Sequence, residues 1–166
     1  MHFCASFSLL HRDKKIFMNR KSTLLANMLS QLESALTSLS KDIQSLRDSR
    51  ASDGKSTAGD KHETARAMVD QELKQLENQQ AKTAKMRADL LSLSLAPSAR
   101  VQAGSLVETA RGTFFLSVSL GKINESDGRG VFAVSPISPI AQAMLSLEVG
   151  DAFEINGVAN EVKAVS

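Results

Sequence analysis

The sequence predicts an α+β protein in which an N-terminal antiparallel coiled-coil hairpin precedes a small β-rich domain. Three observations support this: a strict heptad repeat over 25–46, a second helical pattern after a turn-rich connection, and a change to short β-type runs after Pro97. The 166 residues include seven Phe but no Trp and no Tyr. Such a shortage of aromatic residues suits a helical rod with one compact unit better than one large core.

The first helix is indicated by apolar residues that follow one another at alternating spacings of four and three. The residues between them, such as Gln31, Glu33 and Lys41, are polar. Because so narrow an apolar stripe pairs with one other helix, we predict a coiled coil. The repeat consists of Leu25, Leu29, Leu32, Leu36, Leu39, Ile43 and Leu46.

The second helix is predicted from Asp60 to about Leu95, after the Ser-, Gly- and Asp-rich segment 48–60, which is typical of a turn. Two helices joined by a short connection pack antiparallel, so we predict a hairpin over 20–96 with its tip at about 50–62, and a monomer. Polar residues interrupt the apolar pattern of this helix. Its apolar positions are Ala65, Val69, Leu73, Leu76, Met86, Leu90 and Leu93, and the interruptions are Gln79, Gln80 and Thr83.

A small β-rich domain is predicted over 100–166. Five short runs with strand character alternate with turn signals, and Pro139 is placed to open a short helix. A few strands and one helix of this size form an α+β domain. The predicted strands are 105–109, 113–120, 130–134, 151–155 and 160–165, with a turn cluster at 124–130.

Residues 1–19 are interpreted as a disordered extension, and Met18 suggests that 1–17 precede a natural start. The basic cluster from Arg12 to Lys21 has two interpretations, a contact with nucleic acid or an acidic protein surface and a solvated tail, of which the tail is favoured. Cys4 is the single cysteine, so no intramolecular disulfide forms, which suits the cytoplasm. No apolar run approaches the roughly 20 residues of a membrane span. The net charge of +2 argues against a broad nucleic-acid-binding face.

The segment SPISPIAQAMLSLEVGDAFEINGVANEVKAV resembles the C-terminal domain of the GreA/GreB transcript cleavage factors. That family has an SPI segment followed by Val-Gly-Asp and an alternating strand. The matching residues are Ser138, Pro139, Ile140, Ala141, Ala143, Leu145, Val149, Gly150 and Asp151. The stretch from Gly59 to Ala67, GDKHETARA, is similar to the family's hairpin tip. The resemblance implies an FKBP-like fold for 100–166.

The resemblance also implies a function. In the family the hairpin enters the secondary channel of bacterial RNA polymerase, where tip carboxylates help to hold a second Mg²⁺ that activates water for cleavage of backtracked RNA. Asp60 and Glu63 stand in that position, so they are the implied catalytic and metal-binding residues, with a Mg²⁺ shared with the polymerase and no cofactor of the chain's own. Nascent RNA would lie near the tip. The protein would be an accessory factor and not an enzyme.

The family's C-terminal domain grips the rim of the channel, so the implied polymerase-binding residues are Ser138, Pro139, Ile140 and Asp151. Apolar residues at helical spacing, such as Ile140 and Met144, more often form core.

The tip residues also have other interpretations. Asp60 and Glu63, three apart at a helix start, form a capping-box pattern. Nearby Lys61 and Arg66 offset the acids, and Thr64 replaces the family's usual Asn. The sequence therefore leaves open whether cleavage is stimulated or inhibited. The alternative function is a non-catalytic coiled-coil module that binds the polymerase as an inhibitor, or binds another partner.

Overall fold

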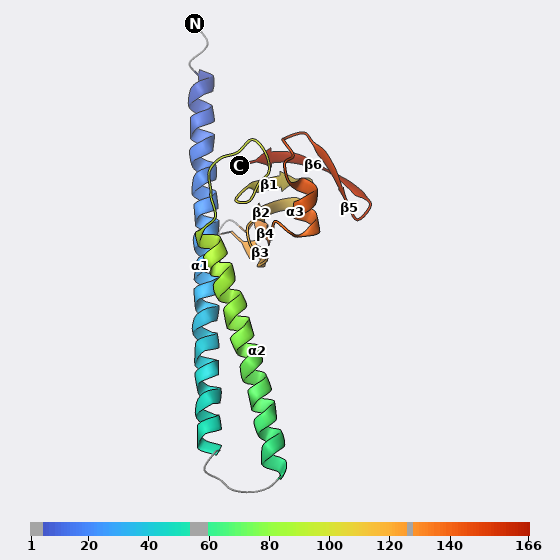
Figure 1. Cartoon of the computed structure of the whole chain (residues 1–166). Helices are drawn as coiled ribbons and strands as arrows, with labels where there is room; N and C mark the ends of the chain where they lie inside the picture. Colours follow the sequence, from blue (N-terminus) through green and yellow to red (C-terminus); the bar gives the residue numbers. More distant parts are fainter. Residues whose placement is uncertain (1–4, 54–59, 126–127) are drawn as a thin grey trace. The chain divides into compact units, whose positions relative to one another are not determined.

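The computed structural model describes residues 5–53, 60–125 and 128–166, with side chains described over 20–51, 63–125 and 128–166. The chain divides into two compact units (Figure 1). The hairpin unit is Leu29–Ala88, and the β unit combines Met1–Met28 with Asp89–Ser166. The α+β class is confirmed. The elements are α1 (Ala5–Asp53), α2 (Asp60–Leu91), β1 (Leu106–Thr109), β2 (Gly112–Leu116), β3 (Gly121–Asn124), β4 (Gly130–Val134), α3 (Pro139–Met144), β5 (Ala152–Ile155) and β6 (Val158–Val165).

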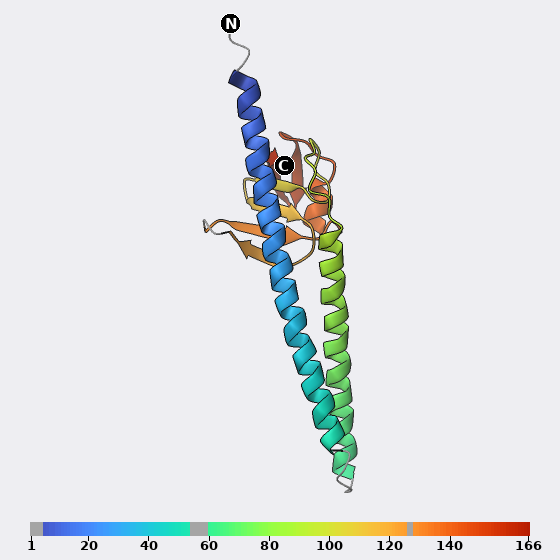
Figure 2. The ribbon, with the colours of Figure 1, turned by 90° about the vertical axis from the view of Figure 1, so that its left-hand side faces the viewer.

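Within the hairpin unit, α1 and α2 run antiparallel. Side-chain contacts between the helices fix the direction, because residue numbers rise along α1 as they fall along α2. The four contacts are Glu33 with Arg87, Ser40 with Gln80, Arg47 with Glu77 and Arg50 with Asp70. Figures 1 and 2, turned by 90°, both show the two helices side by side in this unit.

The predicted seam of α1 faces its partner helix. Leu32, Leu39 and Ile43 are buried, and the other four members of the repeat are half-buried. The heptad pattern therefore identified the packing face correctly. The predicted turn differs from the structure at one end: α1 continues to Asp53, so only 54–59, which lie outside the described residues, separate the two helices.

The β unit is built on one six-stranded sheet with the order β3-β4-β2-β1-β6-β5. β2 and β4 pair in parallel, and the other neighbouring pairs are antiparallel. The sequence predicted five of these strands and missed β3. Its residues GKIN carry a single apolar side chain, Ile123, beside the turn cluster, so they lack the alternation that indicates a strand.

One face of the sheet carries α3. Val107, Phe114 and Leu116 are buried there together with Ala141 and Met144 of α3. These residues form the core on this side of the sheet, so the apolar positions at helical spacing in α3 are core positions, as the sequence favoured.

The opposite face of the sheet is covered by α1. Leu106, Phe115 and Ala133 are neighbours across three strands, and all are buried. Leu24 and Met28 of α1 are buried as well. In both ribbon views α1 and α3 lie on opposite sides of this sheet (Figures 1 and 2).

The N-terminal segment differs from the prediction of a disordered extension over 1–19. Helix α1 begins at Ala5, so the backbone of 5–19 is helical, and residues 20–28 belong to the β unit and not to the hairpin predicted from 20. For 20–28 the physical reason is that a sheet with two apolar faces needs a second cover besides α3. In the described part of the chain, no helix is long and apolar enough to cross a bilayer.

Candidate functional site

The predicted tip acids lie at the start of α2. Asp60 is the first residue of the helix, and Glu63 follows one turn later with an exposed side chain. The side chain of Asp60 lies outside the described residues, so both the capping and the metal-binding interpretations stay predictions. No group of three or more His, Cys, Asp or Glu placed to hold a metal ion occurs among the residues whose positions are described.

The first turns of α2 are solvated beyond the acids. Residues from Glu63 to Met68 are all exposed, including the cation Arg66. The described part of the tip is thus exposed all round the helix, with mixed charge, and the carboxylate of Glu63 is accessible to a partner.

The SPI segment is a helix start. Ser138 is the N-cap of α3, where its Oγ accepts a hydrogen bond from the Ala141 backbone N–H at 3.4 Å, and Pro139 is the first helical residue. Both choices are favourable there, because the cap satisfies a free N–H and proline lacks one. Ile140 is half-buried against the core of the α3 face. These three residues therefore have structural roles in this chain.

Asp151 closes a reverse turn. Its Oδ2 accepts a hydrogen bond from Glu148 N–H at 2.8 Å, and its own N–H donates to Glu148 C=O at 3.1 Å. Gly150 between them has φ +94°, which favours glycine. Two backbone hydrogen bonds with Val162 connect the turn to β6. The Val-Gly-Asp motif therefore determines where and in which direction β5 begins.

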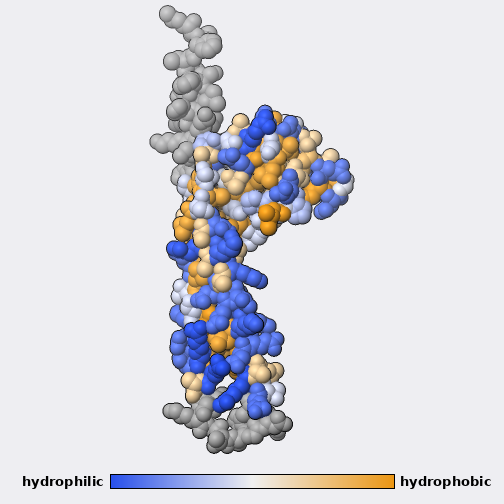
Figure 3. Space-filling model, in the orientation of Figure 1, coloured by the Kyte–Doolittle hydropathy of each residue, from blue (hydrophilic) through white to orange (hydrophobic). Residues whose placement is uncertain are grey.

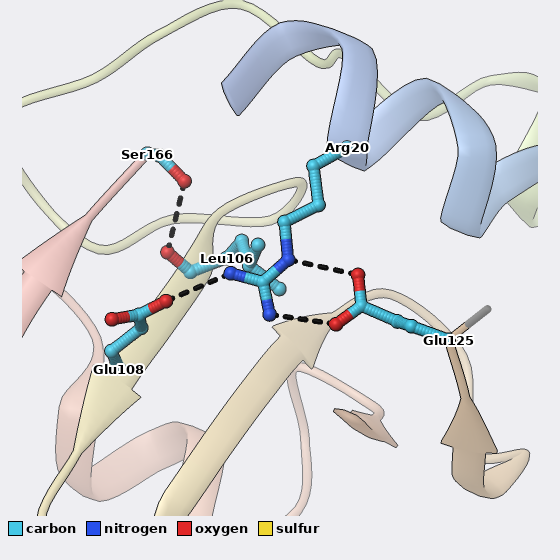
Figure 4. Close-up of polar contacts among 5 residues, drawn as sticks. All are labelled: Arg20, Leu106, Glu108, Glu125 and Ser166. Carbon is cyan, nitrogen blue, oxygen red and sulfur yellow. Dashed lines mark hydrogen bonds and ion pairs between the residues drawn. The ribbon is translucent and has the colours of Figure 1, made fainter. Parts of the chain in front are cut away.

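Sequence reasoning missed an ion cluster centred on Arg20 (Figure 4). Arg20 donates from Nε and Nη2 to both carboxylate oxygens of Glu125, and from Nη1 to Glu108 Oε1, each at 2.8 Å. The side chains of Arg20 and Glu125 are each 11% exposed, and that of Glu108 is 38% exposed. The hydrogen bonds to Glu125 raise the pKa of Arg20, burial opposes them, and the contact with Glu108 adds to the rise.

Lys21, the next residue, is 1% exposed and donates from Nζ to Gly104 C=O at 3.2 Å. The interpretation of the basic cluster as a solvated tail is thus wrong for Arg20 and Lys21. No sequence signal distinguishes them from their neighbours, because their partners lie 83 to 105 residues away in the chain.

Lys21 makes stability depend on pH. Burial lowers the pKa of its ammonium below the ordinary 10.5, because the charged form loses its hydration. Between the lowered value and 10.5 the unfolded chain binds more protons than the folded one, so the free energy of unfolding rises with pH in that window. We expect Lys21→Met to remove this rise when urea unfolding is followed at pH 7 and pH 10. Lys163→Met, at an exposed position, is the control; equal pH dependence in all three proteins would contradict the prediction.

Exposed apolar side chains mark the surface of the β unit. Ile137, between the two prolines of the SPI segment, is 84% exposed, and Val149 of the Asp151 turn is 59% exposed. Figure 3 shows apolar residues interspersed on the visible face of the β unit, whereas that of the hairpin unit is largely hydrophilic. The sequence feature that could have indicated the exposure of Ile137 is its place between turn-forming residues, where an apolar side chain is not part of a helix or strand.

Comparisons with known proteins give little. No protein-family model matches the chain, and no curated protein matches it. Among solved structures, the chain is similar to the crystal structure of GreA factor homolog 1 (Gfh1) of Thermus thermophilus. The match has 18% sequence identity and a TM-score of 0.33, and covers 83% of this chain and 94% of that one.

Proposed function

We propose that this chain is a Gre-like factor that binds bacterial RNA polymerase by inserting its hairpin into the secondary channel, where it modulates elongation. The observation that carries the proposal is an antiparallel two-helix hairpin whose second helix begins with Asp60 and has the exposed Glu63 in its first turn. A motif similar to the Gre C-terminal domain follows in the same chain, in the same order as in that family.

The two acids would act on chemistry that the polymerase owns. Mg²⁺ takes hard oxygen ligands and keeps several waters, so one or two added carboxylates are enough to help hold a second ion beside backtracked RNA. The chain then needs no cofactor of its own and works as an accessory factor in the cytoplasm, as a monomer with nascent RNA near its tip.

The mixed charge of the tip is compatible with two modes of action. Arg66 is exposed on the same helix as Glu63, and a nearby cation weakens the attraction of a carboxylate for Mg²⁺. A factor of this kind either stimulates cleavage weakly or occupies the channel without stimulating it. Both modes need binding, and only the first needs the acids.

The polymerase-contacting surface of the β unit is proposed to include Ile137 and Val149. They are the exposed neighbours of Ser138 and Asp151, the residues that shape the two turns. An exposed apolar side chain on a fixed turn gives a binding contact for which the backbone is already ordered, so that only side-chain entropy is lost.

The acids are tested on a polymerase stalled in a backtracked complex. If the protein stimulates cleavage, Asp60→Ala with Glu63→Ala is expected to lower the stimulated rate at least about tenfold, as for loss of transition-state charge stabilisation, while competition with a standard Gre factor for the polymerase persists. Glu72→Ala, at an exposed position further along α2, is the control.

Each outcome of this assay is informative. Inhibition by the wild type that survives in the double variant assigns the inhibitory mode. Failure of the wild type both to alter cleavage and to compete with a Gre factor would refute polymerase binding. The alternative, a module for another partner, then gains support if a pull-down from bacterial lysate recovers no polymerase subunits.

A further inference from the structure

The two helices of the hairpin contribute unequally to their shared seam. On α2 the residues that face α1 follow spacings of four and three and are all buried or half-buried, whereas neighbours such as Gln79 and Lys82 are exposed. These residues begin with three apolar side chains and continue into a mostly polar half, here called the half-seam, in which Met86 is the apolar member: Val69, Leu73, Leu76, then Gln80, Thr83, Met86 and Arg87. The opposing seam of α1 is apolar throughout 25–46.

Each polar residue of this half-seam has a partner within the hairpin. Gln80 Nε2 donates to Ser40 Oγ at 2.9 Å, and Ser40 in turn donates to Leu36 C=O at 2.8 Å. Thr83 Oγ1 donates to Gln79 C=O at 2.8 Å. Arg87 donates from Nε and Nη2 to Glu33 Oε1 at 3.2 and 3.0 Å.

Two of these contacts exist in one register only. Glu33, Ser40 and Arg47 recur every seven residues on one flank of α1, and they face Arg87, Gln80 and Glu77 in turn. A slip of α2 by one heptad would place Arg87 opposite Ser40 and Gln80 opposite Arg47. The ion pair of Arg87 would then be lost, and Gln80 would face a cation.

The leucine-rich seam of α1 is also able to pair with itself. Leucine or isoleucine fills both seam positions from Leu25 to Leu46, a pattern that supports coiled coils between separate chains. If α2 were equally apolar, exchange of helices between two copies would keep every apolar contact. An exchange in the native register also keeps the contacts of Gln80 and Arg87 with Ser40 and Glu33, but pairing of α1 with α1, or in a shifted register, loses these contacts and leaves the polar side chains without them.

We propose that Gln80 and Arg87 form a register lock that holds the hairpin in one alignment and disfavours out-of-register pairing between copies, at the expense of stability, with Thr83 as a further polar seam position. The lock is independent of what the tip binds, so it holds whether or not the polymerase is the partner. It also fixes which residues stand at the free end of the hairpin, since a heptad slip would move Glu63 by seven positions relative to α1.

The lock is tested with Gln80→Leu combined with Thr83→Val, which makes the half-seam apolar and leaves Arg87 in place. We expect the melting temperature to rise by about 5 °C, as a gain of apolar burial would give in a small domain. Light scattering after size-exclusion chromatography should show a dimer fraction that grows with concentration, while the wild type stays monomeric under the same conditions.

A matched control places the same substitutions at exposed positions of α2: Gln79→Leu with Thr64→Val. This control is expected to remain monomeric with an unchanged melting temperature. The proposal is overturned by a seam variant that stays monomeric at every concentration, by a wild type that is itself dimeric, or by a control that dimerises to the same extent.

Discussion

Replacement of Gly104 by alanine is expected to lower the free energy of unfolding of the β unit by about 3 kcal/mol or more, since backbone strain and steric overlap add. Gly104 has φ +88°, and a Cβ there would lie 1.9 Å from the backbone oxygen of Ser94. Backbone must move to relieve such overlap. Any shift also weakens two contacts of Gly104, its N–H bond to Leu116 C=O at 2.8 Å and its C=O bond with Lys21.

The matched control for this prediction is Gly121→Ala. Gly121 also has a positive φ, +74°, but a Cβ there meets no atom within 4 Å. Only backbone strain remains, so we expect a loss of about 1 kcal/mol. Circular dichroism during urea unfolding suits the measurement, because the chain has no Trp or Tyr. Equal losses in both variants would show that the close approach to Ser94 has no energetic weight.

Replacement of Arg20 by methionine is expected to lower the free energy of unfolding by about 3–5 kcal/mol, the range for breaking a buried ion pair. Methionine keeps much of the apolar stem but leaves the carboxylate of Glu125, which is 11% exposed, without its two charged hydrogen bonds. Glu108 loses its partner at lower cost, because it is 38% exposed and still hydrated.

Two comparisons separate charge from packing at Arg20. Arg47→Met removes an exposed pair with Glu77 and should cost at most about 1 kcal/mol. Adding Glu108→Gln and Glu125→Gln to Arg20→Met should recover part of the loss, because neutral amides are cheaper to bury unpaired than carboxylates. A loss in Arg20→Met no larger than in Arg47→Met would mean that the cluster does not hold α1 on the sheet.

The hairpin was predictable because its information is local. Alternating spacings of four and three specify a seam, and the structure buries that seam at Leu32, Leu39 and Ile43. The extent of each helix was less predictable. The polar segment after Arg47 suggested a turn, yet α1 continues to Asp53, since a solvated helix end needs no apolar residues.

The β unit was predictable in part. Asn156 and Gly157, with φ of +51° and +74°, join β5 and β6 as a two-residue hairpin turn, and this dipeptide is a strong turn signal that would have placed the start of β6 at Val158. The cover provided by α1 could not be found from local pattern. It depends on Arg20 meeting Glu108 and Glu125, and on Leu24 and Met28, whose spacing falls outside the heptad.

The residues that carry the resemblance to the Gre family proved to be mainly architectural. Ser138 caps a helix and Asp151 closes a turn, so both specify the local fold of the β unit. The candidate chemistry rests on Asp60 and Glu63, for which the sequence evidence is the similarity of 59–67 to the family's hairpin tip and a spacing that a helix cap also explains. Motifs of turns and caps are easier to recognise than surface chemistry, because they depend on adjacent residues.

The β unit is discontinuous in the chain, because its first 28 residues are separated from the remainder by the whole hairpin unit. The sheet cannot be complete, with α1 on one face and α3 on the other, until the last strands have been synthesised. The hairpin can form earlier, because its two helices are adjacent in the sequence. If the hairpin forms early, it brings residues 28 and 89 close together. The chain segment that must be closed to bring 20–28 of α1 onto the sheet is then effectively shorter. The hairpin would thus assist folding of the β unit by bringing its two parts together. A fragment that starts at residue 89 would lack the part of α1 that covers one face of the sheet.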